Sequence, residues 1–127
     1  MVDFHEYFLV KIRFDKVTVE NLKTGETKGS DATLKFSNDR LLIVSPTEPA
    51  ETIKRFVDQL SVKNLFQFKR TIIINARHPN ILKFEETEKM MLRDVGAQAG
   101  SNIYLSFDEE VNAKEINLSS LSLRFEL

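Results

Sequence analysis

Three consecutive isoleucines at positions 72–74 limit the folds that this chain can adopt. A strand with one solvated face alternates apolar and polar residues, whereas a strand covered on both faces has an unbroken apolar run. We therefore predict a long strand over residues 65–76, whose apolar centre is buried on both faces of a sheet.

The N-terminal third has the period-two alternation of half-buried strands. Apolar residues stand at every second position from Phe8 to Phe14, and again at Val17 and Val19 with the opposite parity. The change of parity predicts a bulge or a break in the strand near Asp15.

A turn and a hairpin are predicted next. Residues 21–26 have the composition of a turn, in which Gly25 can adopt a positive φ angle. Apolar residues then alternate over residues 32–36, and residues 37–40 lead into a second apolar run at 41–44. Two strands joined by a four-residue loop account for this pattern.

Two helices are expected. The apolar stripe of the first has the spacing i, i+3, i+4, i+7 and consists of Ile53, Phe56, Val57 and Leu60. Residues Ser45 to Glu48 have the form of a capping box at its start, and Thr47 is an alternative cap. The second helix is predicted over residues 84–95, with Gly96 as its C-terminal stop.

These segments predict one α+β domain over residues 1–127. Its sheet is mixed and largely antiparallel, with about five to seven strands and two helices packed on it. Residues 81–84 can be read as a strand or as the start of the second helix. Strand-like residues at 103–107 and at 116–127 complete the pattern, and we expect both termini to be structural.

The composition excludes several classes of function. The chain has no cysteine, so disulfides and thiolate metal sites are ruled out, and His5 and His78 have no companion residues at metal-site spacing. The acidic N-terminal residues do not resemble a signal peptide, and no apolar stretch approaches a membrane span. We expect an intracellular, cytoplasmic protein without a cofactor or a membrane contact.

The charge is segregated along the chain. Residues 59–84 carry five basic side chains and no acidic one, whereas the remainder holds 13 basic and 19 acidic residues. A basic strip of this kind suits an acidic protein partner or a nucleic acid. The residues that we predict to bind a partner or an anion are Lys63, Lys69, Arg70, Asn75, Arg77, His78, Asn80 and Lys83.

The turn at residues 75–80 is the strongest candidate for a ligand site. It follows the predicted central strand, and ligands of α/β sheets gather beyond the carboxyl ends of strands. Arg77 is suited to hold a phosphate or a carboxylate, and His78 to exchange a proton. A solvated polar loop is the simpler interpretation of the same residues.

Three functions fit these observations. The first is a non-enzymatic interaction or assembly module, such as a bacterial or phage accessory protein, which binds a protein partner or itself through the basic strip and sheet edges. The second is a nucleic-acid-binding accessory protein, in which Phe66 or Phe68 stacks on bases beside the basic strip. The third is a small enzyme that acts on an anionic ligand at Arg77 and His78. No catalytic constellation is recognisable, so we predict no catalytic residue.

Overall fold

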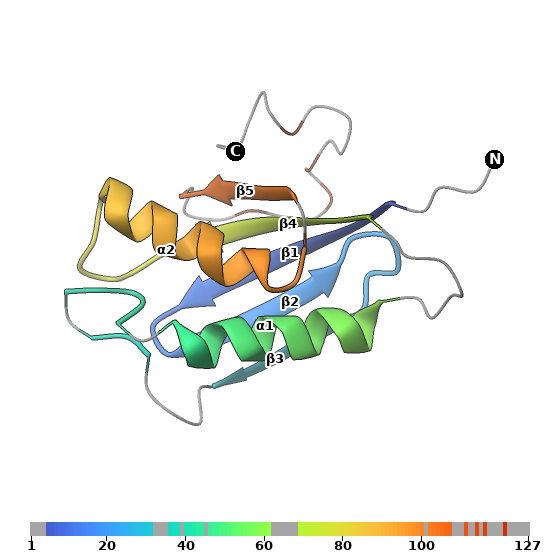
Figure 1. Ribbon diagram of the computed structural model, residues 1–127, viewed down its shortest axis with the longest axis horizontal. Helices are drawn as coiled ribbons and strands as arrows, with labels where there is room; N and C mark the ends of the chain where they lie inside the picture. The colour runs from blue at the N-terminus through green and yellow to red at the C-terminus, as the bar shows by residue number, and fades with distance from the viewer. Residues whose placement is uncertain are drawn as a thin grey trace.

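The computed structural model describes residues 5–31, 36–38, 40–44, 46–61, 69–100 and 102–107, together with Val111, Lys114, Ile116 and Leu121. These residues form a sheet and two helices (Figure 1). In chain order the elements are β1 (His5–Arg13), β2 (Lys16–Asn21), β3 (Thr27–Asp31), α1 (Thr47–Leu60), β4 (Lys69–Ala76), α2 (Glu86–Ala97) and β5 (Asn102–Ser106).

The sheet is mixed, with the strand order β3-β2-β1-β4-β5. β1 pairs antiparallel with β2, and β2 antiparallel with β3, whereas β4 is parallel both to β1 and to β5. The α+β class, the mixed sheet and the two helices are therefore confirmed. Among the described strands, parallel and antiparallel pairings are equal in number: β1, β2 and β3 pair antiparallel as consecutive strands, whereas β4, which follows α1, is parallel to both of its neighbours.

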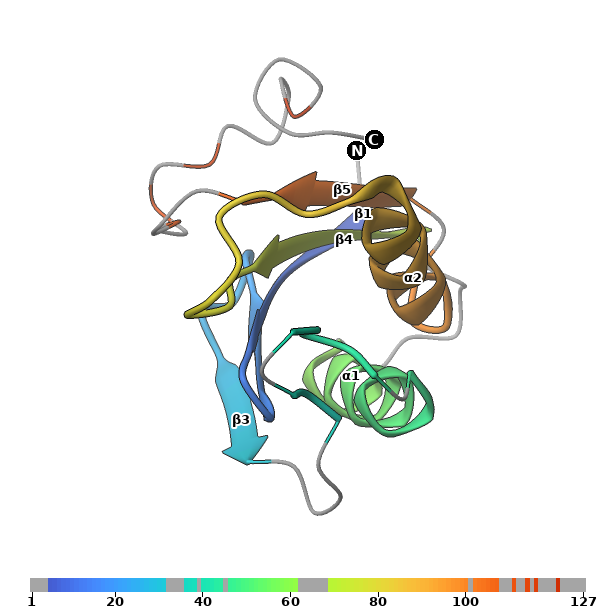
Figure 2. The same ribbon diagram turned by 90° about the vertical axis from the view of Figure 1, so that its left-hand side faces the viewer.

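Both helices lie on the same face of the sheet (Figure 2). On that face Phe8, Ile72 and Ile74 form one apolar cluster with residues of α1 and α2. On the opposite face Leu9 and Ile73 pack against Val111 and Leu121. All three isoleucines of β4 are fully buried, as predicted, although residues 65–68 of the predicted strand lie outside the described part.

The change of parity near Asp15 marks a tight hairpin turn and not a bulge. β1 ends at Arg13 and β2 begins at Lys16, and Asp15 has a φ angle of 52°. This left-handed conformation is tolerated by aspartate better than by most residues. The predicted turn at Gly25 is confirmed, with a φ angle of 78°.

The prediction of a strand over residues 41–44 is wrong. The backbone N–H of Val44 donates to the carbonyl of Phe36 across a turn, but no strand forms. Leu42 and Ile43 are adjacent and both enter the same core cluster, which an extended strand does not permit. The third strand is instead the polar segment β3, where exposed edge residues replace apolar alternation.

The first helix agrees with its predicted pattern. α1 begins after Pro46, Ser45 lies outside the described residues, and the four residues of the apolar stripe are buried. α2 begins at Glu86 and includes Gly96, so the prediction of a glycine stop is wrong. A Cβ atom at Gly96 would lie 2.9 Å from Cδ1 of Ile74, so this glycine allows α2 to approach the sheet closely.

Residues 81–84 belong to neither a strand nor a helix. Ile81 makes an isolated bridge with His78, and Phe84 is buried ahead of α2. Neither described residue of the predicted C-terminal strand lies in a strand, since Ile116 is irregular and Leu121 is helical. Both contribute to the second apolar cluster, and the remaining residues of this segment are outside the described part. The same holds for residues 1–4, so the expectation of structural termini stays a prediction.

Candidate functional site

The carboxyl ends of β1 and β4 meet at a topological switch point. The chain leaves β1 toward β2 on one side and leaves β4 toward α2 and β5 on the other. Ligands of open sheets commonly bind where such connections diverge. Three segments gather at this edge of the sheet (left in Figure 1), and we call their described residues, 13–16, 36–38 with 40–44, and 77–85, the carboxyl end.

Asn75 is a structural residue of this end. Nη1 and Nη2 of Arg13 donate to its carbonyl oxygen and its Oδ1, at 2.9 and 2.6 Å. Its own Nδ2 is 3.3 Å from Oγ of Ser106. Asn75 is fully buried and so connects β1, β4 and β5. The predicted role of orienting a ligand is therefore not supported by its surroundings.

His78 joins two loops of the carboxyl end. Its Nε2 is 2.6 Å from the carbonyl oxygen of Asn38, and its Nδ1 accepts the backbone N–H of Asn80 at 3.0 Å. These partners require the tautomer with the proton on Nε2. The ring is buried and lies 5.5 Å from the ring of Phe14. Both ring nitrogens are engaged within the protein, so neither is available to a substrate.

The turn at Asp15 connects to the loop beside it. One carboxylate oxygen of Asp15 accepts the backbone N–H groups of Phe36 and Ser37, both at 2.7 Å. In return, the N–H of Asp15 donates to Oγ of Ser37 at 3.0 Å. This carboxylate is therefore satisfied by backbone donors and does not neutralise a neighbouring arginine.

Arg77 has different surroundings from Arg13. It is half-buried, and its Nη1 donates to the carbonyl oxygen of Phe107 at 2.8 Å. Within the described part of the chain its Nε and Nη2 have no hydrogen-bond partner, and no carboxylate pairs with it. A guanidinium held by one nitrogen, with its other donors unused, is oriented to bind an anion.

Arg77 lines a depression of about 370 Å³, which we call the arginine pocket. Its lining residues include no acid and are Arg13, Phe14, Arg77, His78, Pro79, Ile81 and Leu82. Leu82 is 94 % exposed and Phe14 is 41 % exposed. The pocket therefore combines positive charge with apolar side chains that face solvent.

Exposed apolar residues are concentrated at this end. Five large hydrophobic side chains are exposed in the described part, and four of them lie here: Phe14, Leu41, Val44 and Leu82. The fifth, Met90, lies on α2. Such a concentration is typical of a surface that contacts another molecule.

The amino end of β4 is neutralised within the chain. Nη1 of Arg70 is 2.7 Å from Oδ1 of Asp58, and its Nε is 3.9 Å from the buried carboxylate of Glu6. Burial alone would raise the pKa of Asp58, but hydrogen bonds from Lys54 and Arg70, and their charges, hold that pKa below its ordinary value. Lys69 is exposed beside this network. We call the residues of this network, together with Lys69, the amino end.

In the structure, the described residues of the predicted basic strip are therefore divided between the two ends of β4. Lys69 and Arg70 begin β4, whereas Arg77 follows its end and Lys83 is exposed in the next loop. Lys63, Phe66 and Phe68 lie outside the described residues. Sequence reasoning missed Arg13 and Phe14, because the parallel pairing of β1 with β4 brings them beside Arg77. It also missed Leu82, which lies in the same loop as Arg77.

No feature of the described residues indicates a metal site or a membrane span. No group of three histidine or acidic side chains is placed to hold a metal ion in this part of the chain. Neither of the described helices has the length and apolar character needed to cross a bilayer.

Comparison with protein-family models gives no match, and no curated protein is significantly similar in sequence.

Proposed function

We propose that this chain is a non-enzymatic interaction module whose carboxyl end binds an acidic and apolar segment of a partner protein. The observation that carries the proposal is Arg77, whose guanidinium keeps unused donors beside the exposed side chains of Leu82 and Phe14. A carboxylate of the partner pairs with Arg77, and an apolar side chain next to it covers Leu82.

A protein segment fits this surface better than a small anion does. An anion alone would use the guanidinium and leave Leu82 and Phe14 in water. Protein interfaces combine a desolvated apolar centre with charged groups that select the partner. The arginine pocket has both parts within one set of adjacent residues.

The surroundings of the candidate residues also favour binding of a protein over catalysis and over binding of a nucleic acid. Catalysis of proton transfer needs a group within hydrogen-bond reach of the substrate, but both nitrogens of His78 bond to protein groups. A nucleic-acid backbone needs several cations along one surface, whereas Arg70 is paired at the other end of β4.

The test uses a short peptide of alternating Asp and Leu, and the same peptide with Asn in place of Asp. We expect the Asp peptide to bind the full chain more tightly, with an affinity that falls as salt is raised. Arg77→Gln removes the charge and should weaken binding about tenfold, since hydrogen bonds to charged groups are the stronger ones. Leu82→Ser should weaken it by a smaller factor.

Lys69→Gln is the matched control, because it removes one exposed cation from the amino end. It should leave the affinity unchanged. Equal loss of binding in Lys69→Gln and Arg77→Gln would contradict the assigned surface.

Light scattering at low and high salt measures the oligomeric state of the chain. A salt-sensitive oligomer that Arg77→Gln disrupts would identify the partner as a second copy of this chain.

A further inference from the structure

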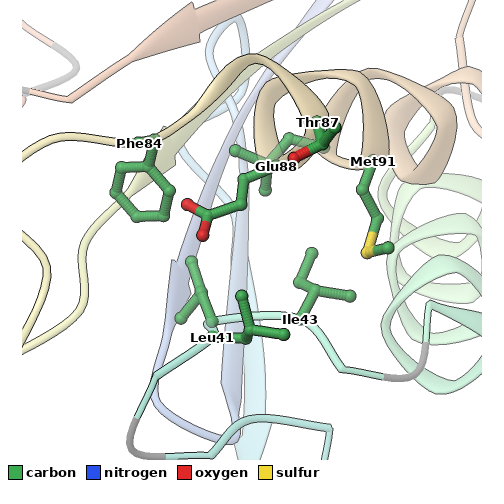
Figure 3. Close-up of a pocket in the computed structure, with 8 residues that line it drawn as sticks. Leu41, Ile43, Phe84, Thr87, Glu88 and Met91 are labelled. Atoms are coloured by element: carbon green, nitrogen blue, oxygen red, sulfur yellow. The ribbon is translucent and has the colours of Figure 1, made fainter.

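A second, smaller cavity lies between α2 and the loop of residues 36–44. Its volume is about 130 Å³. Figure 3 shows its walls, which include Leu41, Ile43, Phe84, Thr87, Glu88 and Met91. The described lining residues are almost entirely apolar, and Glu88 is the only charged one among them.

The carboxylate of Glu88 points into this cavity, between Phe84 and Leu41 (Figure 3). Its Oε2 is buried and has no hydrogen-bond partner in the described part of the chain. Buried polar atoms in folded proteins are nearly always paired, so an exception in a cavity indicates a site for a donor. An ionised carboxylate accepts hydrogen bonds and selects a donor of positive charge.

We propose that this cavity binds a lysine side chain of a partner protein. The four-carbon stem packs on Leu41, Ile43 and Met91, and the ammonium group donates to Oε2 of Glu88. Lysine has this combination of an apolar stem and a charged tip. A cavity of about 150 Å³ holds the six carbons of benzene, so a cavity of about 130 Å³ has room for the five heavy atoms of a lysine side chain.

Lysine fits better than its alternatives. Arginine carries a larger, planar guanidinium group, whereas the compact ammonium group of lysine suits a cavity of about 130 Å³. An uncharged aliphatic side chain would bury that oxygen without a donor. This site is independent of the arginine pocket, because its charge has the opposite sign and its lining residues are different.

The first arm of the test uses small probes and the full chain. n-Butylammonium, n-butylguanidinium and 1-butanol are titrated while the methyl resonances of Met91 and Ile43 are followed by NMR. We expect n-butylammonium to shift both methyl groups and to bind more tightly than the other two probes. Glu88→Gln should weaken n-butylammonium binding about tenfold, as expected for loss of a charged hydrogen bond.

Glu86→Gln is the matched control, since Glu86 lies on the same helix with its side chain 81 % exposed. It should leave the affinity for n-butylammonium unchanged. The proposal is overturned if 1-butanol binds as well as n-butylammonium, or if Glu88→Gln and Glu86→Gln have the same effect. Amide spectra of both variants establish that they are folded.

The second arm distinguishes a protein partner from a free amine. A Leu-Lys-Leu peptide with blocked ends is compared with its norleucine counterpart and with n-butylammonium. We expect the lysine peptide to bind most tightly, because its flanking leucines contact the exposed side chains of Leu41 and Val44. A lysine peptide that binds no better than n-butylammonium would overturn the assignment to a partner protein.

Discussion

Arg70 and Arg77 stand at the two ends of β4, and their surroundings are opposite. Arg70 lies between the carboxylates of Asp58 and Glu6, whereas Arg77 is held by one carbonyl oxygen and faces apolar side chains. A cation with carboxylate partners in its own chain contributes to folding. A cation that retains unused donors beside exposed apolar residues is available to another molecule. We therefore propose that the amino end stabilises the fold and that the carboxyl end binds a partner.

The largest loss of stability is expected from a substitution that disturbs packing near the amino end of β4. A Cβ atom at Gly100 would lie 2.7 Å from Cγ1 of Ile72 and 2.9 Å from the carbonyl oxygen of Arg70. Gly100→Ala should therefore lower the free energy of unfolding by about 2 to 3 kcal/mol, the effect of overpacking a core. Urea denaturation measures it. Gln98→Ala, in the exposed turn before Gly100, is the control and should change stability by less than about 0.5 kcal/mol.

The next prediction compares how much each of the two arginines contributes to stability. Arg70→Met keeps an apolar stem but removes the guanidinium that lies 2.7 Å from Asp58 and 3.9 Å from the buried carboxylate of Glu6. We expect a loss of about 2 kcal/mol in the free energy of unfolding. Arg77→Met loses one hydrogen bond to a carbonyl and should cost less than about 1 kcal/mol. Equal losses in the two variants would remove the distinction between the ends.

A third change tests how the carboxyl end is held together. Asp15→Ala removes the acceptor of two backbone N–H groups and places alanine at a φ angle of 52°. The expected loss is about 1.5 kcal/mol in thermal or urea unfolding. Asp15→Asn should lose less, because asparagine tolerates this conformation and keeps an acceptor. A loss in Asp15→Asn as large as in Asp15→Ala would contradict this explanation.

A smaller effect concerns pH at the amino end. The pKa of Asp58 is held below 3.8, its ordinary value, so its ionised form stabilises the fold above that pH. The contribution is lost as the pH falls through the lowered pKa. Asp58→Asn should cost less than about 1 kcal/mol at pH 7, because the side chain of Asp58 is 44 % exposed and its ion pairs are screened by salt. The difference from the wild type should vanish in acid, and a difference that persists there would contradict the assignment.

The smallest effect on stability is expected at Leu82. Its side chain is almost fully exposed, so Leu82→Ser should change the free energy of unfolding by less than about 0.5 kcal/mol. Binding of the Asp–Leu peptide should nevertheless weaken. A clear loss of stability in this variant would mean that Leu82 supports the fold and is not a contact for a partner.

The sequence predicted those elements whose buried residues form an unbroken apolar run or follow a regular period. The isoleucines of β4 and the stripe of α1 are examples, because every member of each pattern is buried. Leu42 and Ile43 led to the wrong prediction of a strand, since an irregular loop buries two adjacent residues as well as a strand core does. β3 was missed because its exposed residues need no apolar alternation.

The candidate site was predictable only in part. Arg77 was identified from its place after the central strand. Arg13 is 62 residues away from its partner Asn75, and the parallel register of β1 and β4 that joins them is not visible in a local pattern. The engagement of both nitrogens of His78 likewise depends on Asn38, 40 residues away.

The most direct test of the account is an amide NMR titration of the full chain with the Asp–Leu peptide. The account predicts that the largest shifts fall on Phe14, Arg77 and Leu82, and that Lys69 and Arg70 are unaffected. Shifts centred on Lys69 and Arg70, or no saturable shift at Arg77, would contradict the claim that the carboxyl end is the binding surface.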